Sequence, residues 1–138
     1  MTHFTMPATH PLTYALYRFF ASFPIACFTL TVFSDVAYWK TMNLLWLHFS
    51  EWLLLAGLVF GAIALLLAFI AVLFRWDGPT WTDLIGQLIA YCLAVLNSFI
   101  HTADGWTAVI PYGLMVSMAT VAIMALASVV GKRRADYV

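Results

Sequence analysis

Charged side chains are the scarcest feature of this sequence. Only 9% of its 138 residues are charged, whereas 64% are hydrophobic. Soluble domains carry roughly 25% charged and 45–50% apolar residues. A chain this short cannot hide so much apolar surface from water, which excludes a soluble domain. The composition therefore predicts an integral membrane protein in a lipid bilayer.

Other absences exclude further classes of function. The formal net charge is zero, so the chain lacks the basic surface of a nucleic-acid-binding protein. The two cysteines, Cys27 and Cys92, fall inside apolar runs, where cysteine usually behaves as a small hydrophobic residue. No basic stretch precedes the first apolar run, which is therefore expected to remain as a membrane span. The sequence contains no nucleophile–base arrangement, phosphate-binding loop or zinc-ligand spacing, and we expect the protein not to be an enzyme.

Four apolar segments predict an all-α integral membrane fold, an antiparallel four-helix transmembrane bundle forming one domain over residues 1–138. The expected spans are residues 14–33, 44–74, 82–100 and 109–130. At 1.5 Å per residue, a span of about 20 residues crosses a hydrocarbon core of roughly 30 Å. Asn43 and the Thr80–Asp83 pair predict helix N-caps. Asp35 is expected in the loop that follows the first span.

Small residues recur along the last three spans at intervals that alternate between three and four. Lipid tails provide no hydrophobic drive for helix association, so small residues favour close packing by van der Waals contact. The alternation is typical of left-handed packing at shallow crossing angles. These stripes are expected to face the bundle interior or a homodimer interface. They comprise Gly57, Gly61, Ala64, Ala68 and Ala71, then Gly86, Ala90 and Ala94, and finally Gly113, Ser117, Thr120, Met124, Ala127 and Gly131.

The basic residues predict the orientation in the membrane. Four spans place both termini on one side, together with five of the six basic residues, whereas Lys40 alone falls on the other side. By the positive-inside rule, both termini are expected in the cytoplasm of a bacterium, with the protein in its inner membrane. The loops around residues 35–43 and 101–106 then face the periplasm.

Polar residues gather at the outer ends of the spans and form the candidate site: Asp35, His48, Ser50, Glu51, Asn97, His101 and Asp104. Histidines and carboxylates from different helices at one depth can ligate a transition metal, for which the candidate ligands are His48, Glu51, His101 and Asp104. Two imidazoles can also clamp a b-type haem, for which the candidates are His48 and His101, with Asn97 beside them. A quinone headgroup is a further ligand for the same side chains.

A structural interpretation of the same residues stays open. Polar residues are common near membrane interfaces, and His101 can cap the C-terminal end of its helix. Asp104 followed by glycine is ordinary turn chemistry. At 100° per residue, His101 falls on the small-residue stripe of the third span, whereas His48 lies about 140° from the stripe of the second. This phase difference favours a polar cap over a site that uses both histidines.

Several segments along the chain carry a resemblance to a known family: His10-Pro11-Leu12, Phe23-Pro24-Ile25-Ala26, Asn97-Ser98-Phe99-Ile100-His101, Asp104-Gly105-Trp106-Thr107 and Pro111-Tyr112-Gly113-Leu114 with Ser117. Together they resemble the bacterial four-span membrane proteins called domain of unknown function 2231. Some relatives are fused to, or occur beside, periplasmic sugar or aldehyde dehydrogenases and cytochromes. The resemblance therefore implies a membrane anchor or an electron-transfer partner for redox enzymes. Ser22 and Ala103 depart from the histidine and the arginine that family members often carry there.

These observations lead us to expect a non-enzymatic accessory or anchoring subunit whose outer loops and helix faces bind a partner. The alternative is an electron-transfer protein that binds haem b or a transition metal through its outer-face histidines. A small-molecule transporter lacks support, because no span is broken by paired charges.

Overall fold

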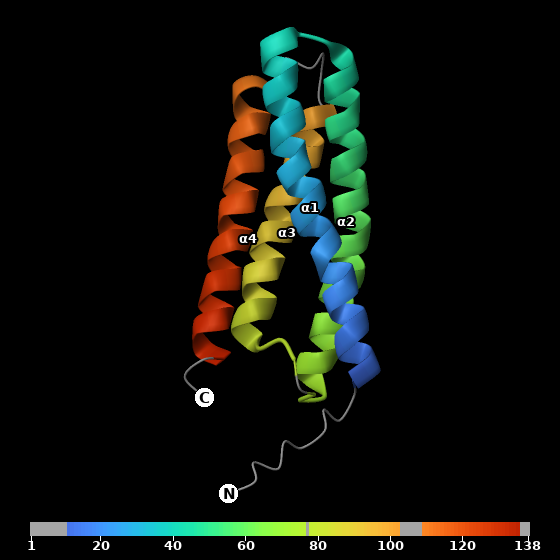
Figure 1. The fold of residues 1–138 in the computed structure, drawn as a ribbon, viewed down its shortest axis with the longest axis vertical. Helices are drawn as coiled ribbons and strands as arrows, with labels where there is room; N and C mark the ends of the chain where they lie inside the picture. Colours follow the sequence, from blue (N-terminus) through green and yellow to red (C-terminus); the bar gives the residue numbers. More distant parts are fainter. Residues whose placement is uncertain (1–10, 77, 103–108, 136–138) are drawn as a thin grey trace, which may run out of the picture.

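The computed structural model describes residues 11–76, 78–102 and 109–135, and these residues form four long helices (Figure 1). The helices are α1 (Pro11–Thr41), α2 (Leu44–Leu73), α3 (Trp81–Thr102) and α4 (Leu114–Ala135), and the short π-helical segment η2 (Val109–Gly113) precedes α4. Each long helix has the length and the apolar composition to cross a membrane. The predicted all-α fold of four candidate spans is thereby confirmed.

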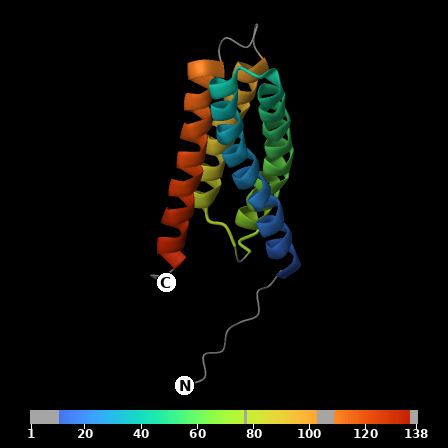
Figure 2. The same ribbon diagram turned by 45° about the horizontal axis from the view of Figure 1, so that its top comes forward.

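The helices run alternately up and down, so that the bundle is antiparallel. α1 and α3 each pack against both α2 and α4. The first residue of α1 and the last of α4 lie at one end of the bundle, as does the α2–α3 connection (Figure 1). We call this the terminal end, and we call the opposite end, where α1 leads into α2, the hairpin end. Figure 2 shows the same arrangement with the hairpin end turned toward the viewer.

Local side-chain hydrogen bonds set two helix starts as the sequence predicts. The Oδ1 atom of Asn43 accepts a hydrogen bond of 3.0 Å from the backbone N–H of Leu45, and Asn43 is the N-cap of α2. Before α3, the Asp83 carboxylate accepts from the Thr80 N–H at 2.8 Å, and the Thr80 hydroxyl accepts from the Asp83 N–H at 3.4 Å. This reciprocal pair is a capping box, which satisfies amide groups that have no partner inside the helix.

Two helices extend beyond their predicted ends. The first span was expected to stop at residue 33 with Asp35 in a loop, but α1 continues through Asp35 to Thr41. The expectation was wrong because an acidic residue can lie inside a membrane bundle when its carboxylate is hydrogen-bonded by neighbouring helices. α4 likewise runs past residue 130 to Ala135. Lysine and arginine, which occupy positions 132–134, have a high helix propensity, so the local sequence favours this extension.

The small-residue stripes predicted from the sequence face the bundle interior. All five stripe residues of α2 are buried, and the buried set continues with the same spacing through Leu47, Ser50 and Leu54. In α3, Ala90 and Ala94 are buried. Gly86 is half-buried, and a Cβ atom placed on it would lie only 2.9 Å from the Cβ of Ala127. The helices therefore approach closely because side chains are small at their contacts, as expected within a membrane.

Gly57 provides a sharp test of this close packing, because a Cβ atom there would overlap the ring of buried Phe28. Overpacking of this kind costs about 1–3 kcal/mol. We expect Gly57→Ala to lower the free energy of unfolding, although alanine raises helix propensity by about 1 kcal/mol relative to glycine. The measurement is an equilibrium unfolding titration in detergent, followed by helical circular dichroism.

Gly61→Ala is the matched control, since a Cβ there would meet the Tyr91 ring at 3.3 Å, which needs only a small adjustment. Adding Phe28→Leu should restore part of the stability that Gly57→Ala loses. Equal stability of the two alanine variants, or no relief from Phe28→Leu, would contradict the interpretation of Gly57 as a steric contact.

Candidate functional site

A buried polar cluster joins all four helices near the hairpin end, and its centre is Asp35 of α1. Its Oδ1 atom accepts a hydrogen bond of 2.7 Å from the Ser50 hydroxyl of α2, and the same oxygen lies 2.9 Å from Nε2 of His101 in α3. Its Oδ2 atom accepts a hydrogen bond of 2.7 Å from the Ser117 hydroxyl of α4. One carboxylate thus contacts a side chain of each of the other three helices.

Asn97 of α3 completes the cluster. Its Nδ2 atom donates to the Ser117 hydroxyl at 2.7 Å, so that Ser117 accepts from Asn97 and donates to Asp35. All five side chains are 0–2% exposed. The Oδ1 atom of Asn97 has no hydrogen-bond partner within the described part of the chain. We call Asp35, Ser50, Asn97, His101 and Ser117 the polar clasp.

The two hydrogen bonds of His101 define the protonation of the clasp. Its Nδ1 atom lies 3.0 Å from the backbone carbonyl oxygen of Asn97, which only accepts. Nδ1 therefore carries a hydrogen, and Nε2 faces the Asp35 carboxyl oxygen. The Nε2–Oδ1 contact then holds one shared proton, as imidazolium with carboxylate or as neutral imidazole with carboxylic acid. Both forms have zero net charge, which reduces the cost of placing ionisable groups at membrane depth.

The sequence spacing explains how these side chains meet. Asn97 and His101 are four residues apart and extend the buried face of Ala90 and Ala94 by one turn each. A Cβ atom placed on Gly113 would lie 3.0 Å from Cε1 of His101, so the absence of a side chain there leaves room for the imidazole. Ser117 follows Gly113 by one turn of the same α4 face. The clasp residues of α2, α3 and α4 therefore lie on stripes that also pack the bundle.

The structure separates the two predicted histidines. His101 and Asn97 lie inside the bundle, as their helical phase indicated. His48 and Glu51 instead face each other across 3.1 Å, with their side chains 52% and 26% exposed. In the described residues, no three His, Cys, Asp or Glu side chains are grouped as a metal site, and the candidate set of His48, Glu51 and His101 is not brought together. Asp104, its fourth candidate, lies outside the described residues.

The clasp also does not fit a haem clamped between two imidazoles. An axial histidine needs a free ring nitrogen, whereas both ring nitrogens of His101 are within hydrogen-bonding distance of an acceptor. His48, the second candidate, is half-exposed and paired with Glu51. The geometry of the described residues therefore does not support the haem or metal alternative.

The central role of Asp35 was the part that sequence reasoning missed. Asp35 was placed at the right level of the membrane but assigned to a loop, because an acidic residue normally marks the end of an apolar run. A useful signal was the spacing of Ser50, which continues the α2 stripe seven residues before Gly57. Ser117 likewise belonged to the α4 stripe. Two serines on interior faces indicate a buried acceptor between them.

A family model described as "Predicted membrane protein (DUF2231)" matches residues 18–137 of the chain. The chain belongs to this family. The matched segment contains every residue of the polar clasp, so the clasp of this DUF2231 protein lies within the family domain. No curated protein and no solved structure shows a significant match to the chain.

A double-mutant cycle on Asp35 and His101 tests the clasp. Removing one partner of a buried ionisable pair leaves the other without compensation, which typically costs 3–5 kcal/mol, so we expect about that loss for Asp35→Ala or His101→Ala. The double variant should lose less than the sum of the two single losses. Equilibrium unfolding of the solubilised protein measures all three.

His48→Ala is the control, because its pair with Glu51 is largely exposed and such pairs contribute about 0–1 kcal/mol. Strict additivity of the Asp35 and His101 effects would argue against direct coupling. A His101→Ala variant as stable as His48→Ala would show that the clasp is dispensable for folding.

Proposed function

We propose that this DUF2231 protein is a non-enzymatic accessory or anchoring subunit of the bacterial inner membrane, which holds a periplasmic redox partner at its hairpin end. The observation that carries the proposal is that Asp35 and His101, the two ionisable side chains of the polar clasp, are buried and contact one another and other clasp residues. Asp35 receives contacts from Ser50, His101 and Ser117, and both ring nitrogens of His101 are engaged.

The burial of these two side chains matters because catalysis needs a reactive group within hydrogen-bond reach of a substrate. The most reactive side chains of the clasp contact one another instead, and Asp35 and His101 are both 0% exposed. Because the Asp35 carboxylate joins α1 to the other three helices, its role is to hold the bundle in register. This supports an anchoring role over a catalytic one.

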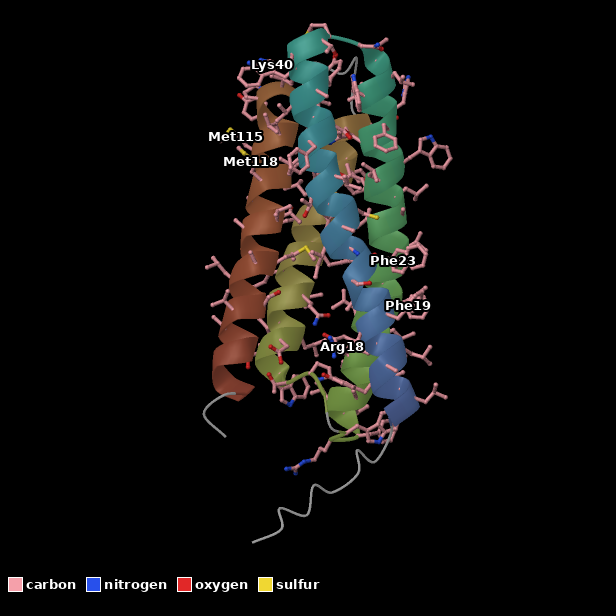
Figure 3. The ribbon with its side chains drawn as sticks, in the orientation of Figure 1. Arg18, Phe19, Phe23, Lys40, Met115 and Met118 are labelled. Atoms are coloured by element: carbon pink, nitrogen blue, oxygen red, sulfur yellow. The ribbon has the colours of Figure 1, made fainter. Side chains whose placement is uncertain are left out.

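The positions of the basic residues support the proposed orientation. Arg18 lies in the lower half of α1 and Lys40 at the hairpin end (Figure 3). Arg75 follows the end of α2, at the terminal end. The basic segment at residues 132–134 lies at the end of α4, which is the same end of the bundle. By the positive-inside rule, the terminal end faces the cytoplasm and the hairpin end faces the periplasm.

The hairpin end carries the surface that we assign to the partner. Among the described residues, two tryptophans are exposed there, Trp39 at 51% and Trp46 at 39%. Tryptophan favours the membrane–water interface, and it is also the side chain most enriched among residues that dominate protein–protein binding. A partner that sits on the membrane surface meets these side chains at the level of the headgroups.

The orientation is tested with two single-cysteine variants, Met42→Cys and Arg75→Cys, in a chain whose native cysteines are replaced by serine. The two positions are matched, since Met42 and Arg75 follow α1 and α2 and have φ angles of 52° and 54°. In intact spheroplasts, a membrane-impermeant maleimide should label the position-42 variant and should reach the position-75 variant only after permeabilisation. The opposite pattern would invert the proposed topology.

The anchoring role is tested by photo-cross-linking in cells. A photoreactive amino acid at Trp39 should give an adduct with a polypeptide of the outer side, whose identification as a redox enzyme or its subunit supports the proposal. Leu126 of α4 is the control, because it is 65% exposed but lies away from the hairpin end. Adducts with lipid or with a second copy of the chain alone, from both positions, would contradict the anchoring role.

A further inference from the structure

A cavity of about 310 Å³ lies in the terminal half of the bundle, and all four helices line it. Tyr14 and Ile25 line its edge and are 41% and 49% exposed, so the cavity reaches the outer surface of the bundle. The space exists because each helix contributes a small side chain to the lining: Ala21, Ala64, Ala90 and Ala127. None of the polar clasp residues is part of this lining.

The cavity is polar at one end and apolar at the other. Several polar lining residues lie next to the terminal end, among them Tyr17, Asp83 and Gln87 from the first two turns of α1 and α3 and Ser128 near the end of α4. The Gln87 amide donates a hydrogen bond to the Tyr17 hydroxyl. The deeper lining is mainly apolar and includes Pro24, Phe28, Ala64, Ala90 and Met124, with the ring of Tyr91 beside Gly61. From Tyr17 to Phe28 the lining extends along α1 for roughly 16 Å, at 1.5 Å per residue.

Water is a poor occupant of the deeper part. A buried water needs two to four polar partners, and apolar cavities of comparable kind remain dry. Empty space of this size is also unusual, because protein interiors contain few voids larger than a water molecule. A hydrocarbon chain from the surrounding bilayer can fill the elongated apolar part of the cavity without requiring hydrogen bonds.

The polar end indicates the headgroup. The Tyr17 hydroxyl accepts from Gln87, which leaves its own hydrogen to donate to an acceptor on a ligand. Asp83 lines the same end, and its carboxylate would repel a negatively charged head. Arg18 lies outside the lining, with its guanidinium 5.9 Å from the centre of the Tyr14 ring. These contacts favour a head that is neutral and carries an accepting oxygen.

We propose that this cavity binds a single-chain neutral amphiphile, with its hydrocarbon chain between the four helices and an oxygen of its head accepting a hydrogen bond from Tyr17. The carbonyl of a quinone and the ester of a monoacylglycerol share this chemistry. The site is independent of the anchoring role, since the cavity and the clasp occupy opposite halves of the bundle.

The test uses the full-length chain in lipid nanodiscs and three radiolabelled probes of equal chain length: a decyl-substituted benzoquinone, monodecanoylglycerol and decanoate. At least one neutral probe should bind saturably, and decanoate should bind at least tenfold more weakly. Tyr17→Phe should weaken the neutral probe about tenfold, whereas Tyr38→Phe is the matched control, because it removes a hydroxyl from a buried tyrosine near the hairpin end. Ala90→Phe should abolish binding by filling the cavity.

Circular dichroism establishes that each variant keeps its helices. If Ala90→Phe does not fold, the comparison of Tyr17→Phe with Tyr38→Phe by itself tests the proposed binding site. Binding of the quinone only, the glyceride only, or both supports the site and identifies the head. The proposal is overturned if neither neutral probe binds above empty nanodiscs, if the two tyrosine variants behave alike, or if decanoate binds more tightly than both neutral probes.

Discussion

A single carboxylate sets the arrangement of this bundle. In a membrane, apolar faces gain nothing by leaving lipid for a neighbouring helix, so hydrogen bonds and close contacts must specify which faces meet. Three helices supply the partners of Asp35: Ser50 of α2 and Ser117 of α4 donate hydrogen bonds to its carboxyl group, and His101 of α3 shares a proton with it. Sliding or rotating any one helix by a turn would remove a donor from a group that has no water to replace it.

The clasp contributes specificity more than net stability. It contains four hydrogen bonds between helices, and such bonds in membranes average roughly 0.6 kcal/mol each, so their sum is about 2–3 kcal/mol. Leaving one member without its partner is costlier than that sum. The correct register is therefore only modestly favoured over the separated helices, but it is strongly favoured over misaligned bundles in which the carboxylate or imidazole is unpaired.

The sequence predicted the fold well because its two main signals are local. The lengths of the apolar segments identified four spans, and the spacing of glycines and alanines in α2 identified the buried face residue by residue. Helical phase also placed His101 inside and His48 outside. Helix ends failed where a tertiary contact overrides local composition, as in the extension of α1 through Asp35. The partners of Asp35 were not predictable, because which stripe faces which depends on the packing of all four helices at once.

A layer of apolar residues separates the polar clasp from the cavity. Phe28 lines the cavity and also belongs to a buried cluster with Leu54 and Ala94. Asp35 follows Phe28 by seven residues, which is roughly 10 Å along α1. A ligand that contacts Phe28 is therefore about two helical turns from Asp35, and the absence of a side chain at Gly57 leaves room for the Phe28 ring against α2. The Phe28–Gly57 contact is therefore one place where α1 and α2 pack directly against each other between the clasp and the cavity.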